Sequence, residues 1–244
     1  MKDHIKYSII IPVFNEEEVI HHTYSRLKTV MESTGETYEL LFINDGSKDA
    51  TAQKLINIRE HDHTVKLIDF SRNFGHQIAI SAGMDFARGE AVVIIDADLQ
   101  DPPELILEMI SKWKDGYEVV YAKRIERKGE TYFKKKTALL FYRTLRALTD
   151  IDIPVDTGDF RLMDRKVCNQ MKSIGEKNRF VRGLVSWVGF KQIGVEYERD
   201  ERFAGETKYP LKKMLKLSLD GITSFSDKPL KLANYLGISL SLVV

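Results

Sequence analysis

The sequence predicts an α/β fold with a mostly parallel, doubly wound sheet that has helices on both faces. Apolar runs of strand length alternate with segments of helical period along the first half of the chain. These runs are nearly continuous in Val, Ile and Leu, which is typical of strands covered on both sides. The 244 residues, 43% hydrophobic and 30% charged, also fit a folded globular chain and exclude a disordered one.

Five apolar runs are expected to form the strands of this sheet. They cover residues 7–13, 38–44, 65–70, 91–97 and 118–122. A loop and then a segment of helical period follow each of the first four runs, so these strands lead into helix N-termini. In open parallel sheets, ligands bind outside the carboxyl ends of the strands, where such loops and helix termini meet. Functional residues are therefore expected in these loops.

Capping signals mark where several of the helices are expected to begin. Asn15, with Glu18 three residues later, resembles a capping box at the start of the first helix. Ser47 is the expected N-cap of the second helix. The third helix is expected over residues 76–88, and the fourth is expected to begin with Pro103 at its first position.

The second half of the chain is expected to extend the same domain, because it shows no repeat and no low-complexity linker. Residues 151–164 are rich in Asp and are expected to form a loop, and the main domain is expected to cover residues 1–205. Residues 206–228 place apolar side chains on one helical face and lysines elsewhere, which predicts an amphipathic helix on an anionic membrane surface or, alternatively, a helix packed on the core. Residues 229–244 are expected to begin a transmembrane segment, with a buried C-terminal helix as the alternative.

Three carboxylates lie within six residues at the end of the fourth expected strand. They are Asp96, Asp98 and Asp101. Like charges so close together repel, but a hard divalent cation accepts carboxylate oxygens, and Mg²⁺ or Mn²⁺ is typically held by one or two carboxylates plus substrate phosphates. The pattern indicates a metal site for a nucleoside diphosphate, and a solvated turn is the alternative.

Polar and aromatic residues also follow the first and second expected strands. Asp45 can accept hydrogen bonds from a base or ribose, and Gly46 lets the backbone turn tightly. Phe14 is suited to flank a base and Glu16 to hold its polar edge. Turn and capping roles explain each of these residues separately. Their shared position at strand ends favours a common binding site.

A further acidic pair and a basic segment lie in the second half. Asp156 and Asp159 are candidates for a general base, and an ion pair with Arg161 is the alternative for them. The basic segment that begins at Lys123 and Arg124 is suited to bind phosphate, and a solvated loop is the alternative.

The motifs together resemble one enzyme family. They read IIIPVFNEEEVI, FINDGSKDAT, SRNFGHQIAISAGMDFARGE, IDADLQDPPE, DTGDFRLMDR and RFAGETKYPLKKM. The chain resembles the family 2 glycosyltransferases of GT-A fold, which has a Rossmann-like sheet. Within them it is similar to the polyprenyl-phosphate glycosyltransferases, which include dolichyl-phosphate mannose synthases and bacterial undecaprenyl-phosphate glucosyltransferases.

The resemblance implies roles for the residues that match these motifs. The nucleotide-binding candidates are Pro12, Phe14, Glu16, Asp45, Asn73 and Ala97. The metal-binding candidates are Asp96, Asp98 and Gln100, and the phosphate-binding candidates are Arg124, Arg127, Arg143 and Lys208. Asp159 stands where the bacterial glucosyltransferases have their general base and the mannose synthases tend to have Ser, so Asp156 is kept as a second candidate for the base.

The implied reaction is inverting transfer of a hexose from a nucleotide sugar to the phosphate of a membrane polyprenyl phosphate, with Mg²⁺ or Mn²⁺ as cofactor. UDP-glucose is the expected donor, with GDP-mannose and UDP-N-acetylhexosamine as alternatives. A membrane-associated protein at the cytoplasmic face is expected, which suits the single Cys168, and a homo-oligomer is left open. A formal charge of +1 gives no global field for nucleic acid, which is not an expected partner.

Two other functions stay open at this point. A nucleotidyltransferase would also use paired carboxylates and a metal, although no Gly-rich, Lys-bearing loop follows the first strand to receive a triphosphate. A membrane-associated binding module would leave the carboxylates without a catalytic role.

Overall fold

The computed structural model describes residues 4–125, 154, 157–176 and 180–198, together with six positions between 230 and 241. The expected amphipathic helix over 206–228 lies outside this part of the chain, as does most of the expected membrane segment over 229–244. Among the described residues, no helix has the length and apolar character needed to cross a membrane.

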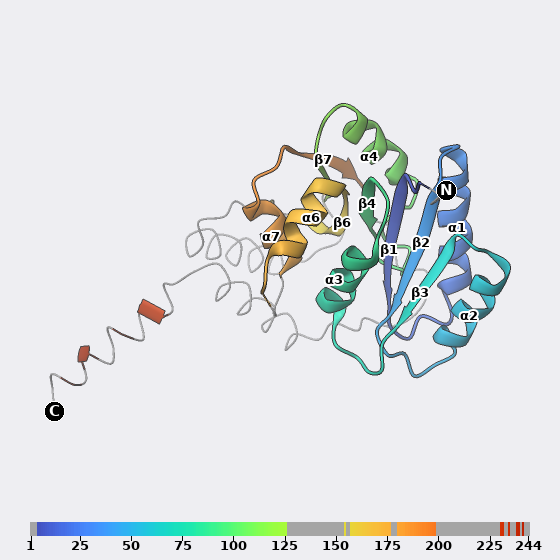
Figure 1. Cartoon of the computed structure of the whole chain (residues 1–244), viewed down its shortest axis with the longest axis horizontal. Helices are drawn as coiled ribbons and strands as arrows, with labels where there is room; N and C mark the ends of the chain where they lie inside the picture. Colours follow the sequence, from blue (N-terminus) through green and yellow to red (C-terminus); the bar gives the residue numbers. More distant parts are fainter. Residues whose placement is uncertain are drawn as a thin grey trace.

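The described residues contain a seven-stranded mixed sheet with the strand order β3-β2-β1-β4-β6-β5-β7 (Figure 1). The strands are β1 (Tyr7–Val13), β2 (Tyr38–Asn44), β3 (Val65–Asp69), β4 (Ala91–Ile94), β5 (Val119–Arg124), β6 (Thr157–Asp164) and β7 (Gln192–Tyr197). In the described sheet, β6 pairs antiparallel with both of its neighbours, whereas all the other pairings are parallel. The expected mostly parallel sheet is confirmed.

Strand β6 corrects the prediction of a loop over residues 151–164. Its first seven residues are all buried, so it has no exposed face to give the usual alternation of polar and apolar residues. Two of its buried residues are Asp159 and Arg161, which are 4% exposed each. These charged residues can be buried because the fold supplies their partners. Their presence in the segment made its sequence pattern resemble that of a loop.

Six described helices cover both faces of the sheet. They are α1 (Ile20–Ser33), α2 (Thr51–His61), α3 (His76–Phe86), α4 (Leu105–Lys114), α6 (Arg165–Ser173) and α7 (Val181–Trp187). Alternate residues of β1 divide between the two layers: Ile9 and Ile11 belong to the core under α1, α2 and α4, and Ile10 to the core under α3, α6 and α7. Figure 1 shows α3, α6 and α7 in front of the sheet.

The expected caps at Asn15 and Ser47 are wrong. Helix α1 begins at Ile20 and α2 at Thr51, each without a hydrogen bond from a capping side chain. Asn15 instead has a φ of 53°, which Asn tolerates, and its side-chain oxygen accepts a hydrogen bond from Lys48 N at 2.8 Å. Ser47 Oγ accepts from Asn15 N at 2.9 Å. The two residues therefore join the loops after β1 and β2.

Two glycines hold α3 close to the sheet. A Cβ at Gly83 would lie 2.3 Å from Ile10 Cγ2, so this residue lets α3 pack directly on β1. Gly46 has a φ of +66°, and a Cβ there would lie 2.4 Å from the carbonyl carbon of Arg72, in the loop before α3. The start of α3 is thus fixed at the carboxyl edge of β1 and β2.

Candidate active site

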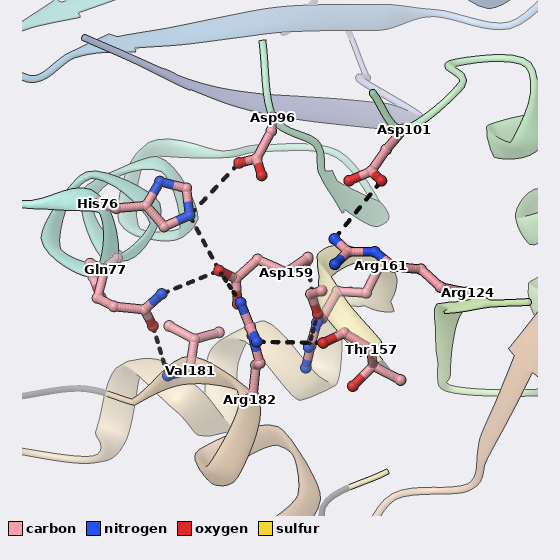
Figure 2. A network of polar contacts seen from close by, with 12 residues as sticks. His76, Gln77, Asp96, Asp101, Arg124, Thr157, Asp159, Arg161, Val181 and Arg182 are labelled. Atoms are coloured by element: carbon pink, nitrogen blue, oxygen red, sulfur yellow. Dashed lines mark hydrogen bonds and ion pairs between the residues drawn. The ribbon is translucent and has the colours of Figure 1, made fainter. Parts of the chain in front are cut away.

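The carboxyl ends of β4 and β5 and the beginning of β6 meet at one edge of the sheet. The antiparallel pairing of β4 with β6 sets Ile94 opposite Arg161, and the same register, continued by two residues, brings Asp96 to the level of Asp159. His76, the first residue of α3, lies between these two carboxylates. Its Nε2 is 3.1 Å from Asp159 Oδ2 and 3.6 Å from Asp96 Oδ1 (Figure 2).

The carboxylate of Asp45 fixes the turn that leads into α3. It accepts hydrogen bonds from Phe74 N at 2.7 Å and from Gly75 N at 2.9 Å, and the residue is 4% exposed. A carboxylate at a helix N-terminus is favourable because the helix dipole is positive there. Since His76 follows Gly75 directly, Asp45 also sets where His76 enters the site.

The other nucleotide-binding candidates lie at the same edge. Pro12 and Ala97 are buried, Phe14 and Glu16 are half-buried in the loop after β1, and Asn73 is exposed in the loop after β3. Asn73 donates a hydrogen bond to the backbone oxygen of Asp45 at 3.3 Å. The structure thus brings these candidates to the ends of adjacent strands, as expected, and their contacts with a nucleotide stay a prediction.

The metal-binding candidates follow β4 in a tight turn. Leu99 has a φ of 57°, and Gln100 N donates to Asp98 Oδ1 at 3.2 Å. Burial and the nearby carboxylates of Asp98, Asp101 and Asp159 raise the pKa of Asp96 to about 6, against the opposing effect of His76. This crowding of carboxylates favours a bound cation.

The donor atoms present fit Mg²⁺ or Mn²⁺ when phosphate oxygens complete the shell. Within the described part of the chain, no three or more His, Cys, Asp and Glu side chains form a group that could hold a metal by themselves. Asp96 and Asp98 nevertheless offer carboxylate oxygens, and a divalent cation at a nucleotide site commonly has only one or two protein carboxylates. The donor set therefore suits a cation that binds together with a diphosphate.

Four contacts hold the Asp159 carboxylate, which is nearly inaccessible to solvent (Figure 2). Arg182 of α7 donates from Nε to Oδ1 at 2.8 Å and from Nη2 to Oδ2 at 3.2 Å. Gln77 Nε2 and His76 Nε2 lie 3.2 Å and 3.1 Å from Oδ2. The carboxylate is therefore held in one orientation by two helices.

These contacts decide the charges in the site. Burial by itself raises the pKa of Asp159, but the charge of Arg182 and the hydrogen bonds from His76 and Arg182 hold it well below its usual range. Burial lowers the pKa of His76, yet Asp96 and Asp159 raise it to about 9. Near neutral pH the site holds an ionised Asp159 and a protonated His76. A carboxylate with so low a pKa is a weak proton acceptor.

The expected ion pair between Arg161 and an acidic neighbour takes a different form. Arg161 donates from Nη2 to Gly158 O at 2.9 Å and from Nε to Asp159 O at 3.3 Å, both backbone oxygens. Arg182, from a helix 23 positions away, binds the Asp159 carboxylate instead. Burial lowers the pKa of Arg161 to about 10, so this guanidinium stays charged.

Arg124, at the carboxyl end of β5, lies on the far side of β6 from α3. Its Nη2 is 3.8 Å from Asp101 Oδ1 (Figure 2). Its Nε donates to Tyr197 Oη at 3.1 Å. A Cβ at Gly158 would lie 2.7 Å from Arg124 Nη2, so the missing side chain leaves room for the guanidinium. Arg124 is thus held at the site edge by its neighbours.

Four candidates from the sequence lie outside the described residues. They are Asp156, Arg127, Arg143 and Lys208. Three residues of the Asp159 network were missed: His76, Gln77 and Arg182. The first two begin a helix directly after the loop of the third strand, a position where ligands commonly bind, so the sequence held a signal for them. Arg182 had none, because only the fold brings α7 to β6.

The chain has clear relatives of known class. A family model described as "Glycosyl transferase family 2" matches residues 8–171. The chain is 73% identical to the glycosyltransferase YkcC of Bacillus subtilis, covering 99% of this chain and 75% of the relative. It is 44% identical to the bactoprenol glucosyl transferase of Shigella phage SfV, covering 96% of this chain and 76% of the relative.

A solved structure supports the fold. The glucosyl-3-phosphoglycerate synthase from Mycobacterium tuberculosis, in complex with Mn²⁺ and UDP-glucose, matches with a TM-score of 0.56 and 17% identity, covering 88% of this chain and 76% of that one. The mixed sheet and its helices thus have the GT-A architecture that the motifs implied. On the family model and the closely similar relatives, the chain belongs to glycosyl transferase family 2 and is a glycosyltransferase.

Proposed function

We propose that the chain transfers glucose from UDP-glucose to the phosphate of a membrane polyprenyl phosphate, with inversion at the anomeric carbon. A relative 44% identical over most of the chain is named for glucosyl transfer to bactoprenol, and a structural neighbour carries UDP-glucose and Mn²⁺. The observation that carries the proposal is the meeting of Asp96 and Asp159 across His76 at the carboxyl edge of the sheet.

The donor is proposed to bind at the ends of β1, β2 and β4. Asp45 and the loop after β1 would contact the nucleoside. Asp96, Asp98 and Gln100 would hold Mg²⁺ or Mn²⁺, which neutralises the diphosphate leaving group when bound. The anomeric carbon would then lie near Asp159, because Asp96 and Asp159 share His76 as a neighbour.

The acceptor phosphate is proposed to bind beside β5 and β6. A phosphate monoester has a second pKa of about 6, so the nucleophile needs little deprotonation near neutral pH. The low pKa of Asp159 fits this requirement, because it makes the residue a poor base but a constant anion. Asp159 would therefore position Arg182 and the acceptor rather than remove a proton. Arg124 would bind the acceptor phosphate, together with Arg127, Arg143 and Lys208.

The acceptor implies a membrane. We propose that residues 206–228 lie on the cytoplasmic surface of the bilayer and that residues 229–244 begin a transmembrane segment. This arrangement would bring the polyprenyl phosphate to the basic side of the site. Association into a homo-oligomer is compatible with it.

A transfer assay tests the proposal. The full chain is incubated with labelled UDP-glucose, Mg²⁺ or Mn²⁺, and undecaprenyl phosphate in detergent, and label is measured in the lipid phase. Label should enter the lipid with UDP-glucose more efficiently than with UDP-N-acetylglucosamine or GDP-mannose. Asp98→Ala should abolish transfer, whereas Asp85→Asn, at an exposed position of α3, should not change it. Nucleotide exchange without sugar transfer, or no transfer from any donor, would refute the proposal.

A further inference from the structure

The side chain of Gln77 connects the Asp159 carboxylate to the helix that carries its arginine partner. Its Nε2 donates to Asp159 Oδ2 at 3.2 Å, and its Oε1 accepts from Val181 N at 2.9 Å (Figure 2). Val181 is the first residue of α7 and Arg182 is the next. One amide therefore contacts both sides of the Asp159–Arg182 ion pair.

The chemistry of its two partners fixes the orientation of this amide. A backbone N–H can only donate, so the atom facing Val181 must be the Gln77 oxygen. An ionised carboxylate can only accept, so the atom facing Asp159 must be the Gln77 nitrogen. The reversed amide would place its nitrogen against the Val181 N–H, which is also a donor, and its oxygen against the Asp159 carboxylate, which is also an acceptor. Gln77 thus has one favourable orientation, and that orientation matches an ionised Asp159.

The contact with Val181 also fills a gap at the start of α7. The residue before this helix, Phe180, makes no capping hydrogen bond from its side chain, and the first amides of a helix have no partner within the helix. Gln77 supplies an acceptor for one of them from α3. Gln77 therefore adds a polar contact to the apolar packing that places α7 and the base of the Arg182 side chain.

We infer that Gln77 is a positioning residue of the transfer reaction: it sets the orientation of the Asp159 carboxylate and the position of Arg182 relative to it. The inference rests on the proposed function for its activity readout. A misplacement of about 1 Å in an active site can cost roughly a hundredfold in rate, so a residue that holds two partners at once has a large effect without touching the substrate.

The test compares Gln77→Glu with Gln77→Ala and a control on the same helix. Glu keeps the length and the acceptor for Val181 but replaces the donor toward Asp159 with a second carboxylate. Ala removes both contacts. Ser81→Ala, one turn further along α3, removes only a hydrogen bond to the backbone oxygen of Gln77 and should leave transfer unchanged. Turnover, the KM for UDP-glucose, the Tm and the pH profile are measured for each variant.

Both Gln77 variants should lose turnover by roughly tenfold or more, with the KM for UDP-glucose within about twofold of the original value, because the nucleotide part of the donor is proposed to bind at other strand ends. The deficit of Gln77→Glu alone should shrink as the pH falls, since two adjacent carboxyls then share a proton and a donor toward Asp159 is restored. The charged groups around this pair are His76 of α3, Asp96 after β4, Arg161 of β6 and Arg182 of α7.

Three results would overturn the inference. They are unchanged turnover in Gln77→Ala, an equal loss of turnover and UDP-glucose binding, and a deficit in Gln77→Glu that does not depend on pH. If Gln77→Glu does not fold, Gln77→Ala alone decides by its turnover and KM. If the original chain transfers no sugar, the proposed function fails, and crystal structures of the original chain and Gln77→Ala decide the inference. An unchanged Asp159–Arg182 pair in the variant would then overturn it.

Discussion

The substitution Gly158→Ala tests whether Arg124 binds the acceptor phosphate without changing Arg124 itself. The new Cβ would lie 2.7 Å from Arg124 Nη2, closer than real Cβ contacts allow. The nearest atom is the end of a flexible side chain, so the guanidinium should move away and the backbone should stay. Arg124 would then lose its positions beside Asp101 and Tyr197.

The expected cost in stability is small because two effects oppose each other. Replacing Gly by Ala inside a strand is favourable by about 0.5–1 kcal/mol. Losing the hydrogen bond from Arg124 to Tyr197 costs about 1.5–3 kcal/mol, less if the displaced guanidinium reaches water. The net destabilisation should therefore be about 0.5–2.5 kcal/mol, or about 1–10 °C in Tm for a domain of this size.

The expected effect on the reaction is larger. A guanidinium moved away from a phosphate loses a charge-assisted contact, so the KM for undecaprenyl phosphate should rise by about tenfold, with the KM for UDP-glucose unchanged. Steady-state kinetics with each substrate varied in turn measure this, and Arg124→Gln should give the same pattern. Gly175→Ala is the matched control, because a Cβ there meets no atom within 4 Å. An unchanged KM for the lipid in a folded Gly158→Ala variant would refute a phosphate-binding role for Arg124.

Three further predictions concern the site and the stability of the fold. Gly46→Ala, which combines a φ of +66° with a Cβ only 2.4 Å from the Arg72 carbonyl carbon, should lower the free energy of unfolding by at least about 2 kcal/mol in a denaturant titration; a smaller loss would mean that the two loops separate easily. Asp62→Asn should lower the free energy of unfolding by about 1.5–3 kcal/mol at neutral pH, because Asp62 accepts a hydrogen bond from Lys28 at 2.7 Å. Burial raises the pKa of Asp62, but the hydrogen bonds from Lys28 and its neighbours hold this pKa below its value in the unfolded chain. The contribution of Asp62 to stability is therefore present above about pH 4 and is lost as the pH falls further. Urea titrations of the original chain and of Asp62→Asn should converge in acid, and a constant difference in their free energies of unfolding would contradict this. Asp159→Asn should reduce turnover by about tenfold or more, because the ionised carboxylate positions groups rather than accepting a proton, and this factor should not change with pH. A loss confined to low pH, below the second pKa of about 6 of the acceptor phosphate, would instead indicate a general base, because only there does the nucleophile carry a proton to be removed.

The strands of the first half could be predicted because each is covered on both faces and bounded by a loop. The run at 38–44 became β2 without change, and the run at 91–97 ended earlier, at Ile94, because the chain turns into the site there. The caps failed for a different reason. Asn15 and Ser47 have the residue types of caps, but each found a partner in the other's loop, and such contacts between loops depend on the fold.

The site could be predicted in part. Residues that follow the parallel strands, such as Asp45 and Asp96, were found because strand ends can be read from apolar runs. Gln77 and Arg182 were not found, because their importance comes from contacts with residues 82 and 23 positions away. Asp159 was named as a candidate base from its acidic segment and then by resemblance to a family, although its strand was taken for a loop.

The reversal of β6 explains how residues so distant in the sequence form one site. In a parallel strand, Asp159 would lie near the amino end and therefore at the edge opposite Asp96. Because β6 is antiparallel to β4 and β5, its first residues lie beside the carboxyl ends of both neighbours, and Thr157 is paired with Lys123, next to Arg124. The proposed donor side at β4 and the proposed acceptor side at β5 thus flank the first residues of one strand. Asp159, between them, is the position from which a single side chain can influence both substrates.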